Sequence, residues 1–315
     1  MPLWGNDKTA LGQAFDGFAA VHGQSFKKLQ TKYGYAIYRT DCSNHKVRII
    51  MNGGGGYGPM WLGFAANKLA DAIVEGEFNS APNAYVLYEM AKKIDDGAGV
   101  LFLANNFMGD YLNNDLATEL LEREGIAAKA IFISDDICSA PREKRIKRGG
   151  LHGIGQVCKA ASYAASEGDD LQTVYIKTQE IANRVRTVSV QLRDQTAYFG
   201  CGFSGEPSVF DMKYENIQEV LQKACDMLIK EMDPWPDDNI YVSINTNRMV
   251  GYTEGCWLSG KLCNILTDYY GRTITACAFG TYFDVFSDEG FMICLLPVER
   301  EAKWITPVET NGFRV

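Results

Sequence analysis

Histidine is scarce in this chain of 315 residues, and long hydrophobic runs are missing. The only histidines are His22, His45 and His152. None lies next to a plausible nucleophile in the sequence, so an imidazole could act only through spatial neighbours that spacing does not reveal. No segment reaches about 18 uninterrupted apolar residues, and the first residues lack the basic and apolar regions of a signal peptide. We therefore expect no membrane-spanning helix.

The nine cysteines form no recognisable framework, because their number is odd and no two have C-x-x-C spacing. A secreted disulfide scaffold and a structural zinc site are therefore not expected, and we predict no metal ligands. Scattered cysteines are typical of small apolar side chains in a reducing compartment. The expected location is the cytoplasm.

Positive charge is in deficit, since 31 Lys and Arg residues stand against 39 Asp and Glu residues, a net charge of −8. This balance argues against a protein that binds nucleic acid by neutralising phosphates. The apolar fraction of 46% and the charged fraction of 22% are ordinary for a folded chain. The composition predicts a globular protein without a direct nucleic-acid partner.

Strand-like and helix-like segments alternate along the chain, which favours an α/β fold with mainly parallel sheets. We expect two α/β domains, an N-terminal one over 1–188 that carries a glycine loop and a C-terminal one over 189–315. The predicted strands cover 46–51, 99–103, 129–134, 240–244, 273–279 and 291–296. The predicted helices cover 61–74, 171–185, 217–232 and 258–266.

The glycine loop joins the first predicted strand to the next helix, and its N–H groups could bind an oxygen atom of a ligand. It lacks the Gly-Lys-Ser/Thr ending of a Walker A loop and the spacing G-x-G-x-x-G. A binding loop and a tight structural turn are equally compatible with this spacing. The candidate binding residues are Gly54, Gly55, Gly56, Tyr57 and Gly58.

Polar residues follow the strand over 99–103, at the end where open α/β sheets bind ligands. Asp110 could act as a general base or bind a substrate hydroxyl, and Asn105 could bind a second hydroxyl. The spacing alone favours a different role, in which Asp110 caps a helix that starts near Asn113.

Two further clusters each admit two interpretations. Asp135 and Asp136 follow a strand and could bind a metal or orient a loop, but a dipeptide of this kind is more often a surface turn. The basic run over 142–148 is most simply a solvated loop, and a docking patch for an anionic partner is the alternative. Ser204, in the loop over 202–207, does not lie in a G-x-S-x-G elbow.

Taken together, these segments resemble the substrate-binding subunit of dihydroxyacetone kinase. The resemblance runs over nearly the whole chain and depends on the order of many short stretches. These are 46–55, Gly63-Phe64, Asp71-Ala72, 76–78 with Ser80 and Pro82, 97–103, 106–110, Asp135-Asp136, Arg148-Gly149, 205–207, Tyr282 and Gly290-Phe291.

The resemblance implies that the chain binds a small ketone or ketose, and that a separate nucleotide-carrying subunit supplies the phosphoryl group. It implies that this chain itself binds no cofactor, since ATP or ADP with magnesium would sit on the partner. It also implies a homodimer of two-domain subunits. Because these loops leave strand ends, where α/β sheets bind ligands, we expect the glycine loop, Asp110 and Ser204 to share one cleft.

The chain departs from the family at its site residues. The family loop G-G-G-S-G-H-E-P has a histidine that helps to remove a proton, whereas this loop is one residue shorter and has none. Ser204 stands where the family has the histidine that forms a covalent hemiaminal with the ketone, and Asn105 stands where it has lysine. Of the four site side chains, only Asp110 is kept.

Three functions follow from these departures. In the first, the chain is a kinase subunit with an altered, non-covalently bound substrate, Asp110 acting as base. In the second, it is an inactive relative that senses a ligand and controls a partner protein, as co-activators in this family do. An unrelated structural role is the third. A hydroxyl such as that of Ser204 needs an activating base before it can replace an imidazole as nucleophile.

Overall fold

The computed structural model describes residues 7, 9–43, 45–66, 68–202, 205–234, 237–284, 289–305, 309–310 and 313–314. Over these residues the chain forms two compact units. One unit contains residues 1–131 and 161–176, and the other contains 132–160 and 177–315. Each unit has its own six-stranded sheet. Within the described ranges, no helix is long and apolar enough to cross a bilayer.

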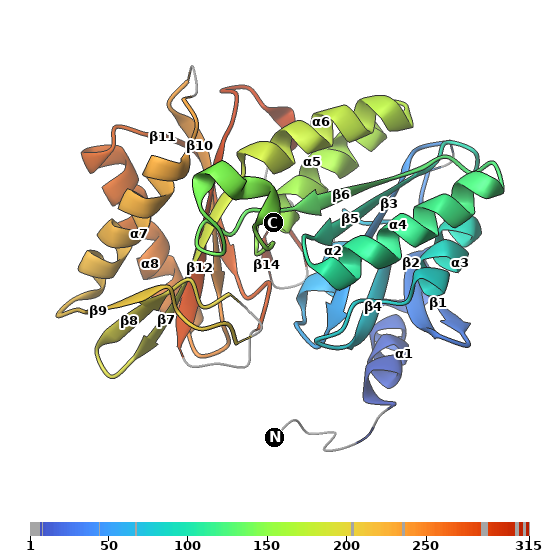
Figure 1. Cartoon of the computed structure of the whole chain (residues 1–315), viewed down its shortest axis with the longest axis horizontal. Helices are drawn as coiled ribbons and strands as arrows, with labels where there is room; N and C mark the ends of the chain where they lie inside the picture. Colours follow the sequence, from blue (N-terminus) through green and yellow to red (C-terminus); the bar gives the residue numbers. More distant parts are fainter. Residues whose placement is uncertain are drawn as a thin grey trace. The chain divides into compact units, whose positions relative to one another are not determined.

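The first unit is built on a sheet with the strand order β1-β2-β4-β3-β5-β6 (Figure 1). Strand β3 lies between β4 and β5 and is parallel to both, whereas β1, β2 and β4 are joined by antiparallel pairing. The strands are β1 (Phe26–Thr31), β2 (Gly34–Arg39), β3 (Arg48–Gly55), β4 (Ala72–Phe78), β5 (Val100–Asn105) and β6 (Ala128–Ile133). The helices of this unit are α1 (Ala10–His22), α2 (Met60–Ala66), α3 (Ala84–Ile94) and α4 (Met108–Arg123).

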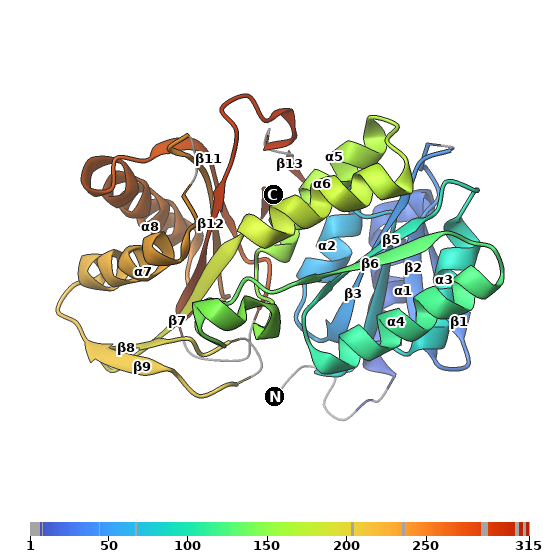
Figure 2. The same ribbon diagram turned by 45° about the horizontal axis from the view of Figure 1, so that its top comes forward.

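Helices α3 and α4 pack side by side on the first sheet (Figure 2). Leu87 and Met90 of α3 and Leu121 of α4 belong to one fully buried cluster with Ile50 and Phe102 of the sheet. Asn83 caps α3 by accepting the N–H of Tyr85 at 2.9 Å, which satisfies one of the free donors of the first turn. Burial of this apolar face stabilises the unit and fixes the strand ends from which the candidate loops leave.

The second unit is built on a sheet with the order β11-β10-β12-β7-β8-β9. Strands β10 and β11 are parallel, and all the other pairs are antiparallel. The strands are β7 (Arg186–Arg193), β8 (Thr196–Phe199), β9 (Phe210–Lys213), β10 (Asn239–Thr246), β11 (Thr273–Gly280) and β12 (Gly290–Pro297). The helices α5 (Ile154–Ser166) and α6 (Leu171–Arg184) have residues in both units, and α7 (Ile217–Glu231) and α8 (Tyr252–Asn264) belong to the second.

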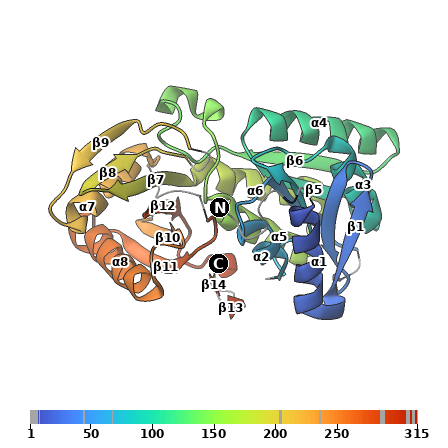
Figure 3. The same ribbon diagram turned by 90° about the horizontal axis from the view of Figure 1, so that it is seen from below.

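The two faces of the second sheet have different chemistry. Helices α7 and α8 cover one face (Figure 3), where Val188, Val242 and Ile293 are buried in an apolar cluster. Side chains of successive strand residues point to opposite faces. The residues between these positions therefore share the other face, where Ser189, Ser243 and other polar residues are buried.

The expectation of an α/β architecture with two sheets is confirmed. Parallel pairing is found at β4-β3-β5, which carry the candidate loops, while among the described strands of the second sheet it is found between β10 and β11. The boundary expected between residues 188 and 189 falls inside β7. In the two compact units, residues 132–160 belong to the second unit and residues 161–176 to the first.

The helix expected over 61–74 is wrong beyond Ala66, where α2 ends. Residues 72–78 form strand β4, because Ala72 to Val74 pair with Ile50 to Asn52 of β3. The buried Asp71 accepts the N–H of Ile49 at 2.9 Å and fixes the start of that pairing.

Candidate functional site

Three loops meet at the carboxyl ends of β3, β4 and β5. A methyl group added to Gly54, near the carboxyl end of β3, would lie 3.2 Å from the nitrogen of Ser80, in the loop after β4. One added to Gly109, after β5, would lie 3.1 Å from Cβ of Ala81. The three loops are therefore in contact at the edge where α/β sheets bind ligands.

The glycine loop is held in place by side chains on three sides. The indole N–H of Trp61 donates to the carbonyl of Gly54 at 2.9 Å, and the N–H of Gly56 donates to Oε1 of Glu75 at 2.9 Å. The hydroxyl of Tyr57 donates to Asn79 in a short hydrogen bond. Tyr57, expected to bind substrate, is thus buried and engaged with the neighbouring loop.

Close approach explains why glycine is required in this loop. A Cβ atom at residue 55 would lie 2.2 Å from the carbonyl oxygen of Gly76, so only glycine fits there. Gly56 has a φ of +89°, a region that other residues rarely adopt. The structural interpretation of the loop therefore holds at these two positions, independently of any ligand.

Asp110 lies in the first turn of α4, which begins at Met108. It is not the N-cap of a helix starting near Asn113, because Phe107 occupies the cap position. Its side chain is 95% buried, and its Oδ1 has no hydrogen-bond partner among the described residues. Burial raises the pKa of Asp110 to about 7.

Asn105 is the last residue of β5 and is 98% buried. Neither its amide nitrogen nor its amide oxygen has a hydrogen-bond partner in the described part of the chain. Buried polar groups are nearly always satisfied in folded proteins. Asn105 at the end of β5 and Asp110 in the first turn of α4 therefore each have polar atoms with which a ligand could form hydrogen bonds.

A pair of buried asparagines connects the glycine loop to Asp110. Asn52 directly precedes the loop, and Asn114 follows Asp110 by one helical turn. Each amide nitrogen donates to the other amide oxygen, at 2.9 and 2.8 Å, and Asn114 also donates to the carbonyl of Asp110 at 2.7 Å. This pair was not predicted, although an asparagine inside the apolar strand over 48–55 is a visible signal in the sequence.

Glu75 of β4 is a second acid that the sequence analysis missed. Burial raises its pKa to about 7, and the hydrogen bond from the N–H of Gly56 opposes the shift. This side chain follows the pattern of a buried strand residue, so nothing in its spacing marked it. Its contact with Gly56 makes it a support for the glycine loop.

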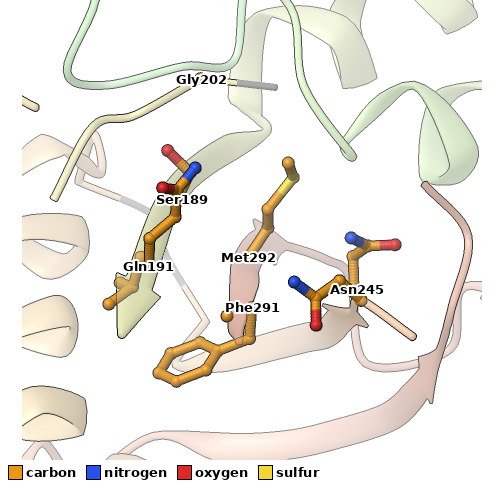
Figure 4. A pocket seen from close by; sticks show the side chains of 9 residues that line it. Ser189, Gln191, Gly202, Asn245, Phe291 and Met292 are labelled. Atoms are coloured by element: carbon orange, nitrogen blue, oxygen red, sulfur yellow. The ribbon is translucent and has the colours of Figure 1, made fainter. Parts of the chain in front are cut away.

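The second unit contains a small pocket on the polar face of its sheet (Figure 4). The hydroxyl of Ser189 lines this pocket, is 97% buried and has no partner among the described residues. None of the nine lining residues is charged. They are Ser189, Val190, Gln191, Gly202, Asn245, Asn247, Gly290, Phe291 and Met292.

The acidic pair after β6 is buried, so the surface turn that its spacing favoured is wrong. Asp135 accepts the N–H groups of Leu151 at 2.6 Å and Gly153 at 2.8 Å, and also the hydroxyl of Thr187. It therefore orients a loop, which was the alternative interpretation. In the described ranges, no group of three or more His, Cys, Asp or Glu side chains could hold a metal ion.

The basic run is largely engaged within the protein. Arg142 and Arg145 both bind the carboxylate of Asp233, at 2.7 and 2.6 Å, and Arg148 is buried beside Glu231 at 2.9 Å. These arginines anchor the segment after β6 to the end of α7. They provide no support for a docking patch.

The predicted common cleft is only partly described. The glycine loop and the first turn of α4, which carries Asp110, both lie against the loop after β4, as the approaches of Gly54 to Ser80 and of Gly109 to Ala81 show. Ser204 lies outside the described residues, so its place in the site stays a prediction. The neighbouring loop positions that are described carry no imidazole.

The fold and these loops define a class, an α/β protein with buried polar groups at its strand ends suited to a small polar ligand. Residues 16–312 match the Dak1 domain, and the chain belongs to that family.

Named relatives and solved structures agree with this assignment. The chain is 28% identical, over 97% of both proteins, to "PTS-dependent dihydroxyacetone kinase 2, dihydroxyacetone-binding subunit DhaK" of Listeria innocua. It is 29% identical to the D-erythrulose kinase of Mycolicibacterium smegmatis, with 85% of this chain covered but only 49% of that protein. The chain therefore spans about half the length of that kinase.

Solved structures show the same fold. The dihydroxyacetone kinase from C. freundii superposes with a TM-score of 0.88 at 23% identity, over 100% of this chain and 61% of that one. A structure described as the dihydroxyacetone kinase operon co-activator Dha-DhaQ superposes with a TM-score of 0.84 at 20% identity, over 93% of this chain and 94% of that one.

Proposed function

We propose that this chain binds a small hydroxyketone or ketose and presents one of its hydroxyls for phosphoryl transfer from a nucleotide-carrying partner subunit. The observation that carries the proposal is the burial of Asp110 and Asn105: Oδ1 of Asp110 and both amide atoms of Asn105 lack partners within the described ranges. The names of the relatives supply the substrate class, dihydroxyacetone or erythrulose.

In the proposed step, the substrate hydroxyl donates its proton to the Asp110 carboxylate while its oxygen attacks the terminal phosphorus of the partner's nucleotide. The bond from that phosphorus to the bridging oxygen breaks, and the nucleoside diphosphate leaves. A general base works best when its pKa is near the working pH, and burial places the pKa of Asp110 at about 7. Positioning supplies most of the remaining catalysis in such transfers.

The rest of the site binds without a covalent bond. The amide of Asn105 can donate to a ligand hydroxyl or carbonyl and accept from a ligand hydroxyl. Backbone N–H groups of the glycine loop other than that of Gly56, which donates to Glu75, are further candidate donors. With Ser204 in place of the family's imidazole, the ligand is held by hydrogen bonds alone. The expected consequence is a changed substrate preference or a low turnover.

The test is Asp110→Asn, with Asp115→Asn as the matched control because Asp115 is an exposed acid on the same helix. Phosphoryl transfer to dihydroxyacetone and to L-erythrulose is measured with the nucleotide-carrying subunit of the same organism, and binding is measured by calorimetry. Asp110→Asn should lower transfer by about 10² to 10⁴, whereas Asp115→Asn leaves it unchanged. Full transfer by Asp110→Asn excludes the proposed base.

A second candidate function is a ligand-sensing regulator that controls a partner protein. The loss of both family histidines favours it, and so does the similarity to a protein described as an operon co-activator. This function predicts ligand binding without phosphoryl transfer. Co-purification with a DNA-binding regulator supports it, and co-purification with a small nucleotide-carrying subunit supports the kinase.

A cytoplasmic homodimer completes the proposal. All nine cysteines are free, which suits a reducing compartment. Light scattering at micromolar concentration should give twice the 35.0 kDa mass of the chain. A mass of one chain excludes the dimer.

A further inference from the structure

Strand β11 is the last strand at one end of the second sheet, and helix α8 lies along it (Figure 3). In the pairing of β10 with β11, Val242 is in register with Cys277, and Ile244 with Phe279. Val242 and Ile244 are buried in the apolar cluster that also contains Leu262 of α8. Residues in register on neighbouring strands share a face. Cys277 and Phe279 therefore lie on the face of the sheet that α8 covers.

One side of α8 faces β11. A Cβ atom added to Gly255 would lie 2.5 Å from Cε2 of Phe279, and the ring centroids of Tyr252 and Phe279 are 5.3 Å apart. Helix residues three or four positions apart lie on the same side. The side that starts with Tyr252 and Gly255 therefore continues through Ser259 to Cys263, in the last turn of α8.

Two cysteines meet between this helix and this strand. The side chains of Cys263 and Cys277 form a hydrogen bond. The segment 264–276 between them makes the return from α8 to β11. Both thiols are free, Cys277 is exposed and Cys263 is half-buried. A small solute can therefore reach the pair.

The hydrogen bond makes the two sulfurs chemically different. It lowers the pKa of Cys263, against the effect of burial, and it raises the pKa of Cys277, which burial raises further. Cys263 is therefore the sulfur that forms a thiolate, with the thiol of Cys277 as donor. The thiolate is the nucleophile in cysteine chemistry. An accessible thiolate beside a second cysteine is the arrangement typical of redox sensors.

We propose that Cys263 and Cys277 are a redox-active pair, which a peroxide converts into a reversible disulfide between α8 and β11. The support is the contact of the two side chains between helix and strand, together with their access to solvent. Disulfides in a reducing compartment are usually transient ones of this kind. The inference uses no residue of the proposed function and does not depend on it.

The proposed oxidation takes two steps. The Cys263 thiolate attacks one oxygen of hydrogen peroxide, the O–O bond breaks and hydroxide leaves, which gives a sulfenic acid on Cys263. The sulfur of Cys277 then gives up its proton and attacks the sulfur of Cys263, the S–O bond breaks, and the oxygen leaves as water. The two thiols together lose two electrons and two protons, and the peroxide is reduced to two molecules of water.

The experiment treats the reduced full chain with a small excess of hydrogen peroxide, blocks the remaining thiols with N-ethylmaleimide and maps the peptides by mass spectrometry. The parent should give a linked peptide pair that contains Cys263 and Cys277 and that dithiothreitol separates. Cys256→Ser is the matched control, because Cys256 is an exposed cysteine on the same helix, and it should give the same linked pair. Cys277→Ser should leave a sulfenic acid on Cys263 that dimedone labels. Cys263→Ser should give neither a linked pair nor dimedone labelling of Cys277.

The parent protein by itself gives a decisive result, so the test does not depend on the folding of a variant. Absence of the linked pair from the oxidised parent overturns the inference, and so does oxidation of Cys256 as fast as that of Cys263. A linkage that non-reducing electrophoresis finds only between two chains overturns it too. None of these measurements involves phosphoryl transfer, so the redox pair and the proposed function can each fail without the other.

Discussion

Asn52 and Asn114 exchange two side-chain hydrogen bonds across 62 positions of the sequence. Both residues are fully buried. They connect β3, just before its glycines, to the second turn of α4. The glycine loop begins directly after one of them, and Asp110 is bonded through its carbonyl to the other. The reciprocal amide pair therefore fixes the two loops relative to each other within the first unit.

The first prediction concerns this pair. Asn114→Leu leaves the amide of Asn52 buried without its main partner, and should lower the free energy of unfolding by about 2–4 kcal/mol. Asn52→Leu should cost a similar amount. The double variant should cost clearly less than the sum, because no orphaned amide is left. Urea denaturation measures all three, with Asn183→Leu on α6 as a control expected to change little. Strict additivity in the double variant would show that the two amides are not coupled.

The second prediction is a pH dependence from Asp110. Burial raises the pKa of Asp110 to about 7 in the folded chain from 3.8 in an unfolded chain, so the unfolded state loses its proton at a lower pH. The contribution of Asp110 to the free energy of unfolding is therefore largest below pH 4. It declines as the pH rises from about 4 to 7 and does not change further above pH 7. Asp110→Asn removes this decline, so its Tm should exceed that of the parent at pH 8 and match it at pH 4.

Asp115→Asn is the control for that measurement, since an exposed acid on the same helix should give no pH-dependent difference. Thermal unfolding at a series of pH values separates the two variants. A Tm difference that stays flat from pH 4 to pH 8 in Asp110→Asn would be evidence against a raised pKa.

The third prediction follows from Ser204. A serine hydroxyl without an activating base does not add to a ketone as an imidazole does, so no stable adduct with dihydroxyacetone should form. Crystals soaked in dihydroxyacetone should lack continuous density between the protein and the ketone carbon. Ser204→His alone should not restore the family's activity. The variant would still lack the histidine of the family's glycine loop and the lysine that the family has at the position of Asn105. Near-normal transfer after that single change would contradict this account of the loop.

The fourth prediction concerns Asp233, which receives hydrogen bonds from Arg145 and Arg142. The hydrogen bond from Arg145 is the main cause that lowers the pKa of Asp233 to about 2. Its contribution to stability is therefore present above pH 4 and is lost as pH falls from about 4 to 2. Asp233→Asn should lower Tm by about 2 °C at neutral pH and should lack that acid transition. Asp237→Asn, a nearby exposed acid, should behave as the parent does.

The sequence predicted the strand ends of the site because those signals are local. The apolar segment at 99–103 and the glycines after 46–51 mark buried strands followed by loops, so the positions of Asn105 and Asp110 were predictable. Parallel strands bring such loops to one edge, which the contacts of Gly54 and Gly109 confirm.

The remaining features depend on contacts between distant residues. Nothing near Glu75 or Asn114 in the sequence shows that their partners are Gly56 and Asn52. The segment over 61–74 has a helical pattern, yet pairing with β3 takes its last residues into a strand. Burial of Asp136, which raises its pKa to about 7, likewise comes from packing that a dipeptide does not reveal.

The chain enters the second unit at residues 132–160 and returns to the first at residues 161–176, and this order has a consequence for synthesis on the ribosome. The first unit contains residues 161–176, so it is incomplete until the chain has grown past the whole of 132–160, a part of the second unit. That early segment must in turn wait for β10 and β12, whose residues Ser243 and Cys294 bond to His152 and Gln156. The first unit can therefore complete its fold only after residue 176 has emerged, and the second only after β12 has been made.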